Sequence, residues 1–205
     1  MEQPSRSGAA LTVRDSMTTE LPSAPPTALP PADPAAPISV QIVPMTAEHI
    51  DAVLAIERAS APHPWTRGIF QDELAHRDSR SYFVALLSAE IVGFGGVLVQ
   101  VGEAHITNIA VVDRFRRNGI ARTLMIRLMA AAVSGSATAA TLEVRTSNVG
   151  AQRMYHRFGF VPAGVRPRYY PDGEDAVIMW ADEIASPFYT ERLAALAQRS
   201  DGDTK

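Results

Sequence analysis

The chain has 205 residues, of which 46% are apolar and 20% charged, and its formal net charge at neutral pH is −3. This length and apolar content suit one packed domain with tails, and the slightly acidic balance argues against a general binder of nucleic acids or membrane surfaces. The sequence has no cysteine, which excludes disulfides, thiolate nucleophiles and cysteine-ligated zinc and fits a reducing, cytoplasmic compartment. Lys205 is the only lysine, so an internal Schiff-base lysine or a Walker-type phosphate lysine is also excluded.

The two ends of the chain differ in composition from its middle. Residues 1–37 hold eight of the fifteen prolines and no aromatic residue, which predicts an extended, unfolded arm. Residues 38–184 carry the apolar patterns of a folded domain, and residues 185–205 are predicted to form a fraying helix and a tail. The longest apolar run, Ile91 to Val99, is far too short to cross a membrane, so no membrane segment is expected.

Apolar alternation predicts strands, and helical spacing predicts helices, in the order βαα βββ α β α ββ. This order predicts an α/β domain with a mixed sheet, helices in layers on both faces and no internal repeat. Thr46 and Thr66 are expected to cap the first two helices, and Gly159 to end the last. The expected elements are a strand at 38–42, helices after Thr46 and Thr66, strands at 82–87, 91–101 and 105–112, a helix at 119–133, a strand at 140–144, a helix at 149–158 and strands at 161–166 and 176–180.

One strand-to-helix junction has the composition of a phosphate site. Residues 109–122 run from the end of a strand, through an arginine-rich turn, to a helix that opens at Gly119. The N–H groups and partial positive charge of a helix N-terminus bind phosphate, and glycine lets the backbone approach it closely. The spacing alone leaves open a solvated arginine-rich turn. A second glycine cluster, at 93–96, lies inside a strand and predicts a bulge or bend.

The pattern Arg116-x-x-Gly119-x-Ala121 resembles the acetyl-coenzyme A loop, Q/R-x-x-G-x-G/A, of the GNAT N-acetyltransferases. The likeness covers about residues 38–182 and implies the GNAT acyl-CoA N-acyltransferase fold, a three-layer αβα structure whose central strands splay apart. Further segments resemble, in order, the RimI group of ribosomal-protein-alanine N-acetyltransferases: Asn108-Ile109-Ala110-Val111, Leu142-Glu143-Val144-Arg145, Ser147-Asn148, Tyr155, Phe158-Gly159-Phe160 and Tyr169-Tyr170-Pro171.

The resemblance implies which residues bind acetyl-coenzyme A. The pantetheine arm is expected on the backbone of the strand before the loop, and the diphosphate on the loop and the first helical turn. No metal is expected, because the five histidines show no metal-ligand spacing. His105 is interpreted as a surface or packed residue, with contact to the substrate cleft as the alternative. The implied donor-binding residues are Ile109, Ala110, Val111, Arg116, Arg117, Asn118, Gly119, Ile120, Ala121, Arg122 and Asn148.

The resemblance also implies an acid and a base for acetyl transfer. Glu143 points away from the strand face that carries Leu142 and Val144, and the RimI group has its proton acceptor at this position. Taken alone, an ion pair with an arginine is the simpler interpretation of Glu143. Tyr155 lies two helical turns after Asn148, on the same face, and the resemblance makes it the donor to the coenzyme A sulfur. Taken alone, Tyr155 is a core tyrosine.

The acceptor implied by the resemblance is the N-terminal alanine of a small-subunit ribosomal protein, acetylated by direct transfer. Trp65, Tyr169 and Tyr170 are expected to wall the peptide pocket, with plain loop packing as the alternative. A GNAT enzyme for lysine side chains or a small amine stays open, and so does a coenzyme A-binding partner protein with little activity. Neither a nucleic acid nor a membrane is expected as a partner, and a monomer is favoured.

Overall fold

The structure is a computed structural model of the chain, and it describes residues 39–198. The unfolded arm predicted for residues 1–37 and the end of the predicted C-terminal tail lie outside the described residues. Among residues 39–198 there is no helix with the length and apolar content needed to cross a membrane.

Within the described residues seven strands form one sheet, in the order β1-β2-β3-β4-β5-β7-β6. Neighbouring strands run antiparallel except β4 and β5, which run parallel. The sheet is therefore mixed, as predicted. The strands are β1 (Gln41–Pro44), β2 (Arg80–Leu87), β3 (Glu90–Gln100), β4 (Glu103–Val111), β5 (Ala139–Arg145), β6 (Val161–Arg166) and β7 (Ala176–Ala181).

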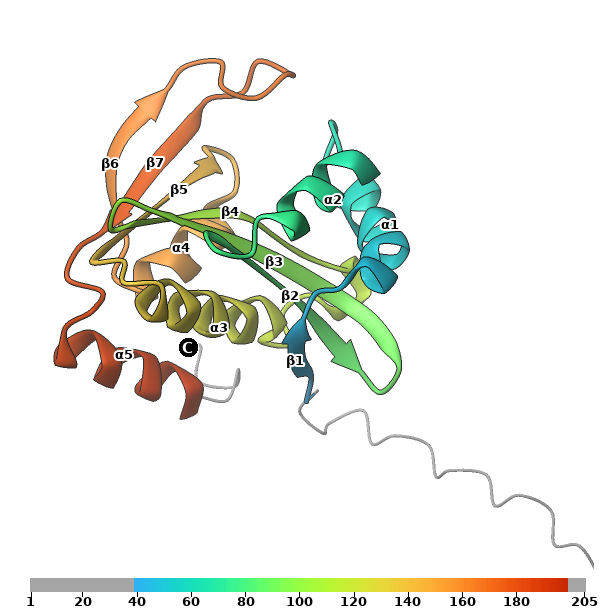
Figure 1. The fold of residues 1–205 in the computed structure, drawn as a ribbon. Coiled ribbons are helices and arrows are strands. Elements are labelled where there is room, and N and C mark those ends of the chain that lie inside the picture. The colour runs from blue at the N-terminus through green and yellow to red at the C-terminus, as the bar shows by residue number, and fades with distance from the viewer. Residues whose placement is uncertain (1–38, 199–205) are drawn as a thin grey trace, which may run out of the picture. The chain divides into compact units, whose positions relative to one another are not determined.

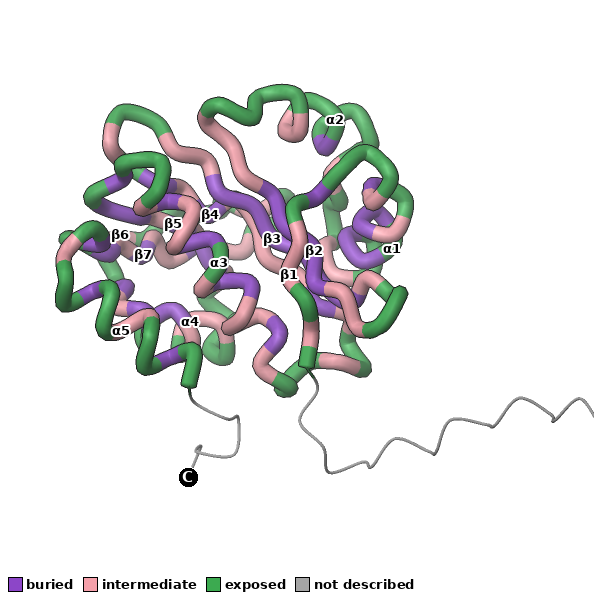
Figure 2. The backbone as a smooth tube through the Cα atoms, turned by 60° about the horizontal axis from the view of Figure 1, so that its bottom comes forward, coloured by how far each residue is buried: buried purple, intermediate pink, exposed green. Residues whose placement is uncertain are grey.

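Helices cover both faces of the sheet (Figure 1). α1 (Ile50–Ser60) and α2 (Arg67–Ala75) pack on one face and share a buried cluster with Phe94 of β3. α3 (Ile120–Ser134), α4 (Val149–Arg157) and α5 (Pro187–Gln198) lie on the other face and bury a second cluster that includes Leu128 and Phe158. Figure 2 shows the buried backbone concentrated in α3 and the middle strands. These three layers confirm the predicted architecture.

Two predicted helix ends have the expected hydrogen bonds. The side-chain oxygen of Thr66 accepts a hydrogen bond from the backbone N–H three residues later, so Thr66 caps α2. α4 ends in a Schellman motif, in which Gly159 N–H donates to His156 O and Phe160 N–H donates to Tyr155 O. Gly159 has a φ of 88°, which suits glycine. The motif anchors the end of α4 that carries Tyr155.

The start of the domain differs slightly from the sequence prediction. The first strand forms at Gln41–Pro44 rather than at 38–42, because its pairing with β2 sets its ends and a strand's limits depend on its neighbours more than on its own alternation. A 3-10 turn at Ala47–His49 stands between Thr46 and α1. Thr46 therefore caps this turn and not α1 itself.

β4 and β5 part after a short stretch of pairing. Only Glu103–His105 of β4 is paired with β5, through Ala139–Thr141, although β4 continues to Val111 and β5 to Arg145. Beyond His105, the edge of β4 that faces β5 has no strand partner. The sheet therefore has an opening between its two central strands, as the resemblance implied.

A β-bulge in β4 lies where the two strands part. Gly96 of β3 faces Asn108, whereas the next residue, Val97, faces Ile106. Thr107 is thus an additional residue of β4 with no opposite residue on β3. A residue inserted in this way bends the strand that carries it. The predicted bulge next to the glycines of β3 is confirmed. The additional residue belongs to β4, the strand paired with β3.

α5 is packed into the domain. Its Tyr189 and Leu196 are only 4% and 6% exposed, in the same buried cluster as residues of α3, and α5 lies against α3. Residues 187–198 therefore differ from the fraying helix that the sequence predicts, because the apolar residues of one segment do not reveal the surface that it will cover.

Candidate active site

A pocket of about 510 Å³ lies between the end of β4, the start of α3, and α4. We call it the donor pocket. All the predicted donor-binding residues line it except Asn118. The side-chain amide of Asn118 instead donates to the carbonyl oxygens of Phe115 and Arg116, at 3.2 and 3.1 Å. The side chain of Asn118 thus stabilises the loop by hydrogen bonds inside it. From its position in the motif alone, this role cannot be told apart from ligand binding.

The loop before α3 has the geometry of an anion site. Gly119 has a φ of 75° and precedes α3 in the left-handed conformation, without a side-chain cap. The N–H groups of the first helical turn have no acceptor within the helix and suit an anion. Arg116 is held by Asp113, at 2.8 Å, and by the carbonyl of Val111, at 3.3 Å. Arg117 lines the donor pocket and forms no ion pair with any residue in the range 39–198. Positive charge therefore faces the pocket at this end.

Asn148 and Tyr155 both line the donor pocket, as their shared helix face predicts. Asn148 also caps α4 through its side-chain oxygen, which accepts from Ala151 N–H at 3.1 Å, so both predicted roles are compatible. The ring of Tyr155 is buried against Phe160. Burial, and then the nearby Tyr170, raise the pKa of Tyr155 to about 12, so its hydroxyl keeps its proton at neutral pH and is able to donate it.

A second pocket, of about 560 Å³, lies at the other side of the opening in the sheet. We call it the acceptor pocket. It brings together Glu143 with Trp65, Tyr169 and Tyr170, the residues that the sequence predicts for the peptide pocket. Ser60, at the end of α1, lines both pockets. The two pockets therefore meet where β4 and β5 have separated.

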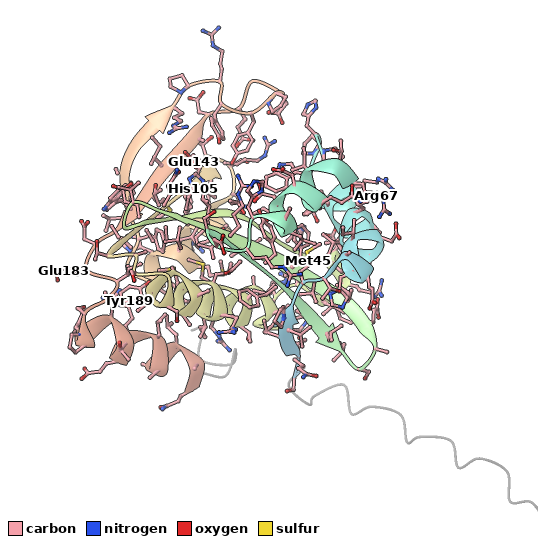
Figure 3. The ribbon with its side chains drawn as sticks, in the orientation of Figure 1. Met45, Arg67, His105, Glu143, Glu183 and Tyr189 are labelled. Atoms are coloured by element: carbon pink, nitrogen blue, oxygen red, sulfur yellow. The ribbon has the colours of Figure 1, made fainter. Side chains whose placement is uncertain are left out.

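Glu143 is buried, with 6% of its side chain exposed, and both its oxygens are engaged. Its Oε2 lies 3.0 Å from Nε2 of His105, and its Oε1 lies 3.2 Å from Nη1 of Arg166. Figure 3 shows His105 and Glu143 next to each other at the open end of the sheet. The arginine that pairs with Glu143 is therefore Arg166 and not the adjacent Arg145, and His105 lines the same pocket as Glu143.

The loop between β6 and β7 is fixed by an ionic cluster on β5. Arg145 Nη1 lies 2.8 Å from Asp172 and 2.7 Å from Glu174, and its guanidinium stacks over the ring of Tyr170 at 3.9 Å. Hydrogen bonds from Ser147, and then from Arg145, lower the pKa of Glu174 to about 2. This cluster holds the two tyrosines of the loop at the acceptor pocket.

Trp65 is held at the opposite wall by a buried carboxylate. Oε1 of Glu57 accepts the backbone N–H of Trp65 at 3.1 Å, and the Trp65 ring packs against Phe70 with centroids 5.5 Å apart. Burial raises the pKa of Glu57, while its bond to Trp65 opposes that rise. Trp65 thus lines the acceptor pocket and also packs on the core.

The opening between β4 and β5, the glycine that starts α3 and the two adjoining pockets define an N-acyltransferase of the GNAT fold. Residues 50–160 match the model of the acetyltransferase (GNAT) family, and the chain belongs to this family.

Named relatives agree with this assignment. A Bacillus subtilis relative, named for ribosomal protein bS18-alanine N-acetylation, is 38% identical over 137 residues, which are 66% of this chain and 91% of that protein. An N-alpha-acetyltransferase of Sulfurisphaera tokodaii is 31% identical over 145 residues, 64% of this chain and 86% of that protein. The crystal structure of the ribosomal-protein-S18-alanine N-acetyltransferase from Escherichia coli has a TM-score of 0.65 and 30% identity, and covers 71% of this chain and 94% of that chain.

Members of the family use acetyl-coenzyme A, and the donor pocket has the chemistry to hold it. The open edge of β4 at Ile109–Val111 offers backbone groups to the amides of a pantetheine arm. The helix start at Gly119, with Arg117 beside it, suits a diphosphate. Among residues 39–198, no group of three or more ligating side chains could hold a metal ion.

Proposed function

We propose that the chain transfers the acetyl group of acetyl-coenzyme A to the α-amine of an N-terminal alanine of a small-subunit ribosomal protein, in the cytoplasm. The names of the Bacillus subtilis and Escherichia coli relatives support this acceptor. The observation that carries the proposal is the position of Glu143, a buried carboxylate in one pocket, beside a second pocket that contains the protonated hydroxyl of Tyr155.

Glu143 and Tyr155 divide the two proton transfers of the reaction. As the amine nitrogen bonds to the thioester carbonyl carbon, Glu143 accepts a proton from that nitrogen, directly or through one water. As the carbon–sulfur bond breaks, Tyr155 donates its hydroxyl proton to the departing sulfur. The products are the acetylated N-terminus and coenzyme A, and the direct transfer requires no cysteine, which this chain lacks.

The basicity of the acceptor favours a chain terminus over a lysine. An α-amine has a pKa of roughly 7.7–8.0, whereas a lysine side chain has a pKa of about 10.4. Deprotonation at neutral pH therefore costs about 1 kcal/mol for the terminus and about 4–5 kcal/mol for lysine. One carboxylate, aided by water, is a sufficient base for the first acceptor.

The proposal is tested with acetyl-coenzyme A and a set of peptides. Peptides that begin with Ala, Ser or Met are compared with a peptide that has a blocked terminus and an internal lysine, and mass spectrometry identifies the nitrogen that becomes acetylated. We expect acetylation of the α-amine, fastest for the Ala peptide. Acetylation of the blocked peptide alone would assign the chain to lysine, and no acetylation of any peptide would favour a coenzyme A-binding protein of another role.

A further inference from the structure

α5 reaches the donor pocket although it lies outside the part of the chain that the family model matches. That match ends at residue 160, and α5 spans Pro187–Gln198. Leu196 of α5 nevertheless lines the donor pocket, together with Arg157 and Phe158 at the end of α4. One wall of the pocket is therefore shared between the matched part of the chain, through Arg157 and Phe158, and α5, through Leu196.

This wall is firmly placed. Tyr189 and Leu196 are buried in the main cluster, and Figure 3 places Tyr189 at the junction of α5 and α3. α5 also covers the turn after α4, because a Cβ at Gly159 would lie 3.0 Å from Nη1 of Arg192. A side chain that α5 presents to the pocket is thus held in position before any ligand binds, which lowers the entropy cost of binding.

The topology indicates which end of the donor meets this wall. The thioester must lie where the two pockets join, at Ser60 of α1, because only there does it adjoin the pocket of Glu143. Figures 1 and 2 place α1 and α5 on opposite faces of the sheet. The wall that contains Leu196 is therefore remote from the thioester, and it is left for the nucleotide end of the molecule.

The chemistry of the wall suits that end. Arg157 lines the donor pocket, is exposed, and has no ion-pair partner within residues 39–198. Leu196 adds an apolar surface beside it. We propose that Arg157 and Leu196 form a subsite for the adenosine 3′-phosphate end of acetyl-coenzyme A, in which Leu196 contacts the nucleoside and Arg157 the phosphate. The proposal rests on the use of acetyl-coenzyme A and is independent of the acceptor.

Calorimetry with coenzyme A and with adenosine 3′,5′-bisphosphate tests Leu196. Leu196→Ala should raise the Kd of both ligands about five-fold. An effect of this size is expected when the contact of about one methylene group with the ligand is lost. Leu193→Ala is the matched control, because Leu193 packs on the same cluster from the same helix without lining the pocket; it should lower thermal stability and leave both Kd values unchanged. Leu196→Met, which keeps the volume, should restore binding.

Arg157→Gln provides a second test that does not disturb the core. It should weaken binding of the bisphosphate, and the loss should shrink as salt is added, whereas Arg153→Gln, on the same helix and away from the pocket, should change nothing. Neither Leu196→Ala nor Arg157→Gln should alter the KM for acetyl-pantetheine, which lacks the nucleotide.

Three results would separate the possible failures. Unchanged bisphosphate binding in both variants, or an equal loss with acetyl-pantetheine, would overturn the subsite. A wild-type chain that does not bind coenzyme A would overturn the donor site together with the subsite. A wild-type chain that binds coenzyme A but acetylates no α-amine would overturn the proposed acceptor, while the calorimetric result would still support the subsite.

Discussion

His105 and Glu143 form a close pair across the two strands that part at the active site, with Nε2 of His105 at 3.0 Å from Oε2 of Glu143. The parallel register places His105 opposite Thr141, two residues before Glu143. The imidazole is 38% exposed while the carboxylate is 6% exposed. The pair therefore connects a buried carboxylate to the solvent side of the acceptor pocket.

Glu143→Gln should abolish most of the activity. The amide keeps the shape of the side chain but cannot accept a proton at neutral pH, so kcat should fall by about 10²-fold to 10³-fold. The KM for acetyl-coenzyme A should stay the same, because Glu143 does not line the donor pocket. His105→Gln, which leaves the carboxylate in place, should lower kcat less. Steady-state kinetics decide, and a Glu143→Gln enzyme with normal kcat would exclude Glu143 as the base.

Tyr155→Phe should slow the departure of the sulfur. Because burial raises the pKa of Tyr155 to about 12, the hydroxyl of the folded protein stays protonated well above neutral pH, and loss of its proton should not limit kcat up to about pH 10. Removing the hydroxyl should lower kcat about 10-fold to 100-fold. Tyr189→Phe is the matched control, since it also removes a buried tyrosine hydroxyl but one that lines neither pocket. Equal kcat values for the two variants would argue against Tyr155 as the acid.

Glu174→Gln should loosen the loop that carries Tyr169 and Tyr170. The pKa of Glu174 is lowered to about 2 from an ordinary value of 4.5, so its ion pair stabilises the fold above pH 4.5 and is lost as the pH falls toward 2. The difference in Tm between wild type and variant should therefore be largest at neutral pH and vanish in acid. The KM for the peptide should rise and that for acetyl-coenzyme A should not. Glu191→Gln, an exposed carboxylate of α5, should show neither effect.

Arg117→Glu should weaken the donor site specifically. Arg117 lines the donor pocket next to the N-terminus of α3, and reversal of its charge should raise the Kd of coenzyme A about 10-fold or more. Added salt should reduce this difference. Arg153→Glu makes the same change in charge on an exposed face of α4, and it should have little effect in the same calorimetric titration. An equal loss in both variants would indicate general electrostatic attraction rather than a diphosphate site.

The elements that the sequence predicts well are those set by local signals. The helix start at Gly119, the cap at Thr66 and the Schellman turn at Gly159 depend on residues within one or two turns of each other. The orientation of Glu143 follows from strand alternation, since Leu142 and Val144 are buried on the opposite face. These features require no knowledge of the rest of the fold.

The parts that the sequence does not reveal depend on contacts between distant segments. Arg166 of β6 pairs with Glu143 of β5 although β7 lies between these two strands in the sheet. Leu196 lines the donor pocket because α5 packs against α3. Ser60 becomes the junction of both pockets only through the packing of α1. No periodicity within any one of these segments predicts its partner. Asn118 shows the converse: a residue inside the motif that the loop uses for its own support.

The brief pairing of β4 with β5 leaves a seam in the middle of the sheet that no other strand closes among residues 39–198. A pantetheine arm bound along β4 would form hydrogen bonds with the unpaired edge of this strand. The free energy of unfolding should therefore rise with the concentration of acetyl-coenzyme A. Saturating coenzyme A should therefore raise the Tm of the domain, with the gain in stability lying in the two strands that flank the opening.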